Sequence, residues 1–226
     1  ALIESDADNI VNYYYAGQIS LAQNNYEKSK KHFKWLTTEA DTVLDGWMNL
    51  ARVYFIQDSI ILAISTYEKG LSHMPKIEDS MVIIYSMAAA NETRDSVDKA
   101  IEQLEFVLEN QPTNSLALNY LGYMLADRGM RLDYAHKLIV RALEIDPNNG
   151  AYIDSYGWVL HRMGKNKKSI KVLLQALQFI ENDPVIFEHI GDVYNTLGNF
   201  KKAREFWGKA YELDPDNDSI MGKLYQ

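Results

Sequence analysis

Four side chains in the last third of the sequence are of the types that bind metal ions or support catalysis. Asp154 and His161 lie seven residues apart, and Glu188 and Asp192 follow within the next 31 residues. Histidine together with carboxylates is a ligand set that divalent metals accept, and these four would meet if their helices were adjacent. The sequence lacks a compact metal motif such as His-Glu-x-x-His. A polar patch on a binding surface is therefore the favoured interpretation, with a metal site as the alternative.

Other catalytic arrangements are missing from the sequence. The glycines are dispersed rather than clustered in a phosphate-binding loop, and there is no Gly-x-Ser-x-Gly elbow. Without cysteine, the chain has no thiolate nucleophile, no disulfide and no cysteine-bound zinc. The remaining histidines are scattered, and we expect them on helix surfaces or in boundary packing: His32, His73, His136 and His189. The sequence predicts a protein that binds rather than catalyses, without a cofactor or metal.

The composition is that of an acidic, folded protein. Aliphatic and aromatic residues make up 47% of the chain, which disfavours disorder, and the net charge is −8. A nucleic-acid-binding protein usually carries a basic stripe that neutralises phosphates. The densest basic run here is Lys165-Asn166-Lys167-Lys168, which we interpret as a solvated turn and helix start. Binding to nucleic acid or to an anionic membrane surface is therefore disfavoured.

The start of the chain does not identify a compartment. Residues 1–9 contain Glu4, Asp6 and Asp8 and do not resemble a signal peptide. No apolar run approaches the ~20 residues needed to span a bilayer, so direct membrane insertion of this chain is not expected. Because the sequence opens with Ala1 rather than Met, we expect a fragment or a processed form. Whether a signal sequence, a lipid anchor or further repeats were removed stays open.

A pattern of large, small and aromatic residues recurs at a spacing of about 34 residues, which indicates a repeat protein. The clearest copy consists of Phe187, Ile190, Gly191, Tyr194, Gly198, Phe200, Ala203, Trp207, Ala210 and Pro215. With five weaker copies upstream, the units span residues 10–43, 44–77, 81–114, 115–149, 150–183 and 184–217. Residues 218–226 would begin a capping helix. The fourth unit has one extra residue in its turn at 127–131, and the fifth is stretched before Pro184.

This pattern resembles the tetratricopeptide repeat (TPR) family. The resemblance implies an all-α fold: one α-solenoid domain, a right-handed superhelix of about six helix-turn-helix repeats over residues 1–226. The residues agree with it, because apolar side chains in 200–213 recur at three- and four-residue spacing. Asp-Pro steps at 146–147, 183–184 and 214–215 mark helix boundaries. We expect a bulky side chain of the partner helix to pack against each of the mid-helix glycines Gly122, Gly157 and Gly191.

In the TPR family, the first helix of each unit lines a concave face, and its positions not used for packing contact partners. Carried over to this sequence, the family pattern predicts partner contacts from Tyr14, Gln18, Leu21, Met48, Arg52, Phe55, Tyr85, Ala89, Glu92, Asn119, Tyr123, Ala126, Asp154, Trp158, His161, Arg162, Glu188, Asp192 and Asn195. Their spacing, near i, i+4 and i+7, puts each set on one helix face. The lysine, arginine and asparagine set that grips C-terminal carboxylates in one branch of the family is incomplete here.

The chemistry of these positions suggests what kind of partner would bind. Tyr85, Tyr123 and Trp158 would form an aromatic floor, unless they pack beneath neighbouring units, which stays open. Asp154, Glu188 and Asp192 would make one end acidic. Such a surface suits a peptide or helix with hydrophobic anchors and some basic residues.

The sequence thus predicts a non-catalytic scaffold or adaptor that binds a protein or peptide. Units four to six are similar to the C-terminal repeats of bacterial outer-membrane lipoprotein adaptors that deliver substrates to a periplasmic protease. This similarity implies an envelope complex and a periplasmic, outer-membrane-anchored protein, with the cytoplasm as the alternative. A self-assembling structural oligomer is the second hypothesis. An RNA-binding helical repeat is disfavoured by the acidic charge, and an enzyme is favoured least.

Overall fold

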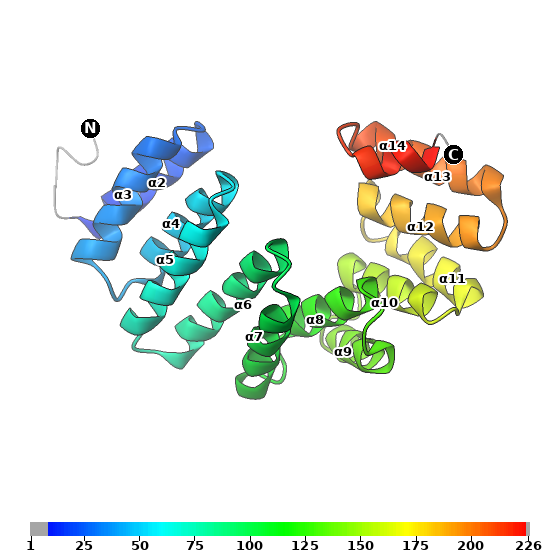
Figure 1. Cartoon of the computed structure of the whole chain (residues 1–226), viewed down its shortest axis with the longest axis horizontal. Coiled ribbons are helices and arrows are strands. Elements are labelled where there is room, and N and C mark those ends of the chain that lie inside the picture. Colours follow the sequence, from blue (N-terminus) through cyan, green and yellow to red (C-terminus); the bar gives the residue numbers. More distant parts are fainter. Residues whose placement is uncertain (1–8, 225–226) are drawn as a thin grey trace. The chain divides into compact units, whose positions relative to one another are not determined.

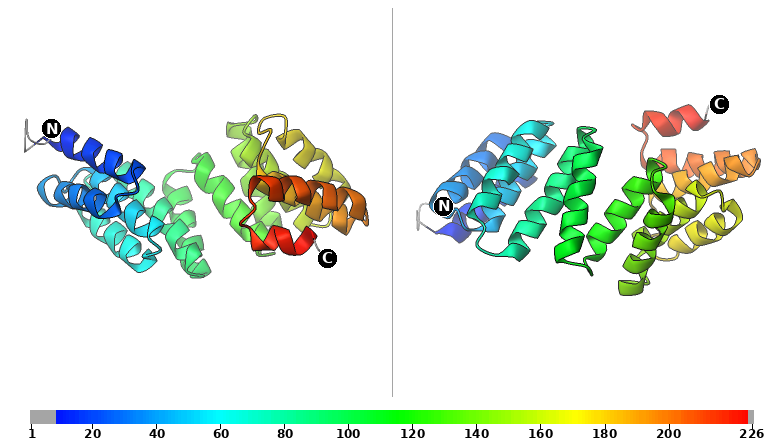
Figure 2. Two further views of the ribbon diagram at one scale, coloured as in Figure 1. Left: turned by 90° about the horizontal axis from the view of Figure 1, so that it is seen from above. Right: turned by 60° about the horizontal axis from the view of Figure 1, so that its bottom comes forward.

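The computed structural model describes residues 9–224, and the regular structure in that range is entirely helical. Consecutive helices form antiparallel pairs joined by short turns (Figures 1 and 2). The chain divides between Asn110 and Gln111 into two compact parts, which we call unit 1 and unit 2. Each unit contains three helix pairs, so the expected all-α repeat fold is confirmed.

The helix pairs follow the predicted units closely. In unit 1 they are α2 (Ile10–Ala22) with α3 (Tyr26–Glu39), α4 (Leu44–Ile56) with α5 (Ile60–His73), and α6 (Ile77–Thr93) with α7 (Val97–Asn110). In unit 2 they are α8 (Ser115–Asp127) with α9 (Leu132–Ile145), α10 (Gly150–Arg162) with α11 (Asn166–Ala176), and α12 (Pro184–Thr196) with α13 (Phe200–Leu213), followed by α14 (Asp218–Leu224). The expected boundary at residue 81 falls inside α6, which begins soon after Pro75 and is the longest helix described, with 17 residues.

The turns inside the pairs share one backbone conformation. One residue in each has a φ between 55° and 77° and is Asn, Asp or Gly, the types that tolerate left-handed backbone: Asn24, Asp58, Asp95, Gly129, Gly164 and Gly198. The next amide then donates to a carbonyl at the end of the first helix, as Lys165 does to Leu160 at 2.8 Å. The extra residue of the fourth turn is present, and Arg131 there is also left-handed, with a φ of 45°.

Small residues on the first helices allow close packing of each pair, as predicted. A Cβ atom added at any of the three mid-helix glycines would collide with a side chain of the following helix: Ile139 at Gly122, Leu173 at Gly157 and Trp207 at Gly191. The Asp-Pro steps also act as expected. Pro184 is in the first turn of α12, and the carboxylate of Asp183 accepts hydrogen bonds from the amides of Val185 and Ile186.

Each unit has its own apolar core. In unit 1, Phe33 and Leu36 of α3 are fully buried beside Leu50 and Val53 of α4. In unit 2, Leu173 and Ile190 belong to a cluster that continues to Ile220 of α14. Ile220 is 1% exposed, because α14 packs it against α12 and α13, and the capping role of this helix stays a prediction. Within residues 9–224, no helix combines the length and apolarity needed to cross a membrane.

Candidate functional site

The residues predicted to contact a partner lie on the first helices of their pairs, but they differ in accessibility. Arg52, Phe55, Arg162 and Asn195 are exposed; Tyr14, Gln18, Met48, Tyr85, Ala89, Glu92, Asn119, Tyr123, His161, Glu188 and Asp192 are half-buried; and Leu21, Ala126, Asp154 and Trp158 are buried. For the buried residues, the structure favours the packing alternative, and contact with a partner stays a prediction.

In unit 1, hydrogen bonds connect two neighbouring first helices. The Nε2 of Gln18 donates to Oδ1 of Asn49 at 2.9 Å, and Nδ2 of Asn49 donates to the carbonyl of Asp45 at 2.8 Å. A pocket of about 210 Å³ lies beside Tyr14, with Ile10, Val11, Tyr15, Leu36, Val43 and Asp45 as its other lining residues. Tyr14 is the only predicted contact residue among them. The pocket is mostly apolar and has one carboxylate at its edge.

In unit 2, Asp154 and His189 form a buried pair that links α10 to α12. The Nδ1 of His189 lies 3.0 Å from both carboxylate oxygens of Asp154, and the two residues are 5% and 6% exposed. Burial lowers the pKa of His189, but the charge and hydrogen bond of Asp154, helped by Asp192 and Glu188, outweigh burial, and the pKa is raised. The expectation that His189 lies on a surface or in boundary packing was wrong. Its signal in the sequence is a spacing of 35 residues from Asp154, one repeat length.

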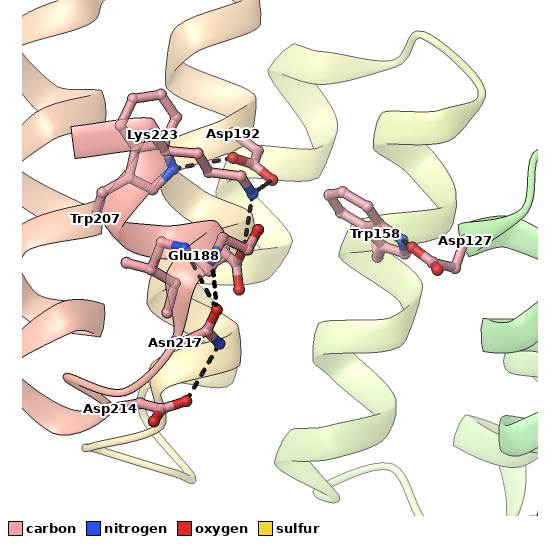
Figure 3. A network of polar contacts seen from close by, with 10 residues as sticks. Asp127, Trp158, Glu188, Asp192, Trp207, Asp214, Asn217 and Lys223 are labelled. Atoms are coloured by element: carbon pink, nitrogen blue, oxygen red, sulfur yellow. Dashed lines mark hydrogen bonds and ion pairs between the residues drawn. The ribbon is translucent and has the colours of Figure 1, made fainter. Parts of the chain in front are cut away.

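Trp158 belongs to the same packed cluster. Its ring stacks on His189 with the centroids 4.2 Å apart, and its Nε1 donates to Oδ1 of Asp127 at 3.1 Å (Figure 3). Tyr123 reaches the other side of this group, with its ring centroid 6.0 Å from that of His189. Trp158 is 7% exposed, so its ring mainly holds α8, α10 and α12 together.

The expected acidic end is balanced by a lysine of α14. The Nζ of Lys223 lies 2.7 Å from Oε1 of Glu188 and 2.7 Å from Oδ2 of Asp192 (Figure 3). The other oxygen of Asp192 accepts a 2.9 Å hydrogen bond from Nε1 of Trp207. Although burial lowers the pKa of Lys223, these two carboxylates raise it overall. With Asp154 paired to His189, all three acidic residues already have positively charged or hydrogen-bonding partners within the fold.

The four residues considered for a metal site do not converge. Asp154 faces His189, whereas the Nδ1 of His161 lies 2.8 Å from Oδ1 of Asn166. Burial is the main reason that the pKa of His161 is lowered. Within residues 9–224, no group of three or more histidine or acidic side chains is arranged to hold a metal ion.

The accessible part of the site in unit 2 has hydrogen-bond donors and an aromatic ring. A pocket of about 360 Å³ is lined by Asn195, Phe200, Arg204, Trp207 and Lys223. Asn195 was predicted, whereas Phe200, Arg204 and Lys223 were not, because they lie on second helices or on α14. Phe200 and Arg204 are four residues apart on one face of α13, which is the signal that would have grouped them. This arrangement can bind acceptor groups next to an apolar side chain.

The sequence is similar to those of known tetratricopeptide repeat proteins. The sequence model of a family described as tetratricopeptide repeat matches residues 186–217. A TPR repeat-containing protein of Pseudomonas aeruginosa is 29% identical over 177 residues, which are 78% of this chain and 28% of that protein. The chain thus spans less than a third of that relative. The name of that relative does not refer to an envelope adaptor, so the finer resemblance stays a prediction.

Solved structures with similar folds were also found. The APC/C hetero-tetramer Cut9–Hcn1 matches with a TM-score of 0.82 at 17% identity, over 99% of this chain and 43% of that one. YrrB, described as a TPR protein with an unusual peptide-binding site, matches with a TM-score of 0.56 at 18% identity, over 86% of this chain and 98% of that one. At such identities the likeness shows the fold.

Proposed function

Because this chain consists of tetratricopeptide repeats, we propose that it is a non-catalytic scaffold that binds a protein or peptide partner through its first helices. The observation that supports this proposal most directly is that several first-helix side chains are left accessible by the packing. Arg52 and Phe55 are exposed on α4, and Arg162 and Asn195 are exposed on α10 and α12. A large aromatic or arginine side chain at an accessible position is typical of binding hot spots.

A second observation concerns hydrogen bonding on α8. The Oδ1 of Asn119 is buried and has no hydrogen-bond partner among the described residues. Buried hydrogen-bond acceptors normally have a donor, and this oxygen would gain one if a ligand donated a hydrogen bond to it. Among the proteins with similar folds, YrrB is described as having a peptide-binding site, and Cut9 forms a hetero-tetramer with Hcn1. These likenesses support the proposal at the level of the fold.

The partner that we propose carries hydrophobic anchors. The mostly apolar pocket beside Tyr14 and the ring of Phe55 in unit 1 would receive them. The three acidic residues predicted at this face, Asp154, Glu188 and Asp192, are paired with His189 or Lys223, so they offer less to basic partner residues than the sequence suggested. We therefore expect apolar contacts to contribute more than ion pairs at this face.

The test is capture of partners on the full chain, followed by quantitative binding of the partner so identified. Arg52→Ala with Phe55→Ala should weaken binding by at least about tenfold, as loss of hot-spot contacts does. The matched control is Lys99→Ala with Phe106→Ala, on the second helix α7, where Phe106 is 44% exposed. Equal weakening in both variants, with both still folded by circular dichroism, would refute a first-helix binding face.

Self-assembly is the alternative to a heterologous partner. If the chain captures only itself and its mass in solution rises with concentration, the structural-oligomer hypothesis replaces the scaffold proposal. The finer proposal of a bacterial envelope complex rests on the resemblance of units four to six to outer-membrane adaptors. Localisation of the native protein to the cytoplasm would refute it.

A further inference from the structure

The turns inside the three helix pairs of unit 2, together with the helix residues next to them, are rich in basic side chains. Asp127, Asp133 and Glu205 lie just outside residues 128–131, 162–168 and 198–204, and these three segments contain nine lysines and arginines: Arg128, Arg131, Arg162, Lys165, Lys167, Lys168, Lys201, Lys202 and Arg204. All nine are exposed, and we call them the basic edge. In the sequence they are separated by about one repeat length, so that no long basic run appears.

The fold places neighbouring turns of the basic edge against each other. The guanidinium of Arg162 reaches the α8–α9 turn, where it would lie 3.2 Å from a Cβ atom added at Gly129. The α10–α11 turn meets the next one in a pocket of about 450 Å³ that is lined by residues 164–168 together with Leu197. The pocket beside Asn195, Phe200 and Arg204 follows on α13. These contacts place Arg162 beside the α8–α9 turn and the α10–α11 turn beside the α12–α13 turn.

The charges of unit 2 are unevenly distributed. Unit 2 has fourteen basic and fourteen acidic residues and is neutral as a whole. Eight of its acidic residues lie in or beside the links between pairs: Glu144, Asp146, Glu181, Asp183, Glu212, Asp214, Asp216 and Asp218. Since the helices of each pair are antiparallel, these links are at the opposite ends of the helices from the basic turns. Unit 2 therefore has a net charge of zero, with basic residues concentrated at one edge and acidic residues at the other.

Several cations of the basic edge have open hydrogen-bonding capacity. Among the described residues, Lys167, Lys201 and Arg204 have no hydrogen-bond or ion-pair partner. By contrast, Lys168 and Lys202 donate to the hydroxyls of Tyr156 and Tyr194 at 3.2 and 3.4 Å. An arginine offers five donors in a planar fork that matches a carboxylate, and a lysine offers a mobile point charge.

We propose that the basic edge of unit 2 is a second docking surface, which binds an acidic segment of a partner protein through its carboxylates. The pockets between the turns favour a protein over a nucleic acid, because Leu197 and Phe200, which are 39% and 63% exposed, would receive apolar side chains next to the carboxylates. A long polyanion would also meet the acidic links of unit 2 and a chain of net charge −8. This surface extends beyond the proposed first-helix face, with Arg162 common to both.

The test uses the full chain and a fluorescein-labelled peptide of glutamate, leucine and serine, beside a twin with glutamine in place of every glutamate. The glutamate peptide should bind, more weakly as salt is raised, and the glutamine twin should not. Lys167→Gln with Lys201→Gln and Arg204→Gln should weaken binding about tenfold, because each exposed ion pair contributes little by itself. The matched control is Lys34→Gln with Lys137→Gln and Lys171→Gln, three exposed lysines that do not belong to the basic edge, and it should bind within about twofold of the unsubstituted chain.

Equal binding of the two peptides, or equal weakening in the two triple variants, would overturn the proposal. Single-stranded RNA and vesicles with anionic lipid are run in parallel. If either binds more tightly than the peptide and loses binding in the first triple variant alone, the edge serves that ligand and the protein assignment is wrong. Arg52→Ala with Phe55→Ala should leave glutamate-peptide binding unchanged, so failure here is distinguishable from failure of the scaffold proposal.

Discussion

Unit 1 and unit 2 are built from the same repeat but differ in charge. Unit 1 has nine basic and seventeen acidic residues, so the net charge of −8 belongs to it, whereas unit 2 is neutral and divided into oppositely charged edges. Both units share the same backbone features: each helix pair has at least one left-handed turn residue, and small residues lie where the helices cross. Packing positions therefore specify the scaffold, and the remaining positions give each unit its own surface.

The units also differ in their buried polar groups. In unit 1, His32 is 8% exposed, and neither ring nitrogen has a hydrogen-bond partner among the described residues. In unit 2, His189 is paired with Asp154 and stacked on Trp158. A buried ionic pair requires good geometry to offset its desolvation. Unit 2 thus contains a buried polar contact that links α10 to α12.

The largest expected effect is loss of a tryptophan from the core of unit 2. Trp207→Ala should lower the free energy of unfolding by about 3–5 kcal/mol, because a buried aromatic is replaced by a cavity. The tryptophan compared with it in unit 1 is Trp35, whose ring is half-buried and stacks on that of Tyr13 with the centroids 3.7 Å apart; the substitution there is Trp35→Ala. We expect about 1–2 kcal/mol there. Urea unfolding followed by circular dichroism measures the free energy of unfolding of both variants. If Trp35→Ala lowered it as much as Trp207→Ala or more, the expected difference between the two tryptophans would be wrong.

The two buried histidines should titrate on opposite sides of 6.5. The pKa of His32 is lowered from 6.5 by burial and by Lys28 and Lys31, whereas the pKa of His189 is raised above 6.5 by Asp154 against the effect of burial. The stabilisation from His189 is therefore present below pH 6.5 and lost as pH rises through its folded-state pKa. For His32 the sign is opposite, and stability is lost as pH falls from 6.5 through its lowered pKa.

Nuclear magnetic resonance of the imidazole groups against pH measures these values. Each signal is assigned by its disappearance in His32→Gln or His189→Gln. Asp154→Asn is the control, since removing the carboxylate charge should lower the pKa of His189 and leave that of His32 unchanged. A His189 that titrates below 6.5 in the unsubstituted chain would mean that its pair with Asp154 is not the dominant interaction.

The smallest effects concern the scaffold that the two units share. Gly191→Ala and Gly17→Ala should each destabilise by about 1–3 kcal/mol, since the new methyl group would collide with Trp207 or Phe33. Gly208→Ala on α13 should instead stabilise by about 0.5–1 kcal/mol, because nothing lies within 4 Å of its added Cβ atom. Thermal and urea unfolding measure all three. If Gly191→Ala or Gly17→Ala raised the stability, the two helices at that position would have room for a methyl group, contrary to the collisions described above.

The sequence alone determined the repeats, because a helix face and a turn are set by neighbouring residues. The small residues, the Asp-Pro steps and the extra residue in the fourth turn are all local features that could be recognised in the sequence, and the structure confirms them. The predicted contact positions lie on the first helices of the pairs. Local periodicity is enough for this, since backbone hydrogen bonds and apolar burial act over a few residues at a time.

Only the tertiary structure decided what those positions contact. His189 pairs with Asp154 and Lys223 pairs with Glu188, each across 35 residues, so which charges are neutralised depends on how neighbouring repeats stack. Trp158 has the spacing of a binding residue, but the helices on either side bury it. The basic edge likewise exists only because stacking brings turns one repeat apart into contact. Coulomb and packing energies depend on distance in space, and the sequence lists only distance along the chain.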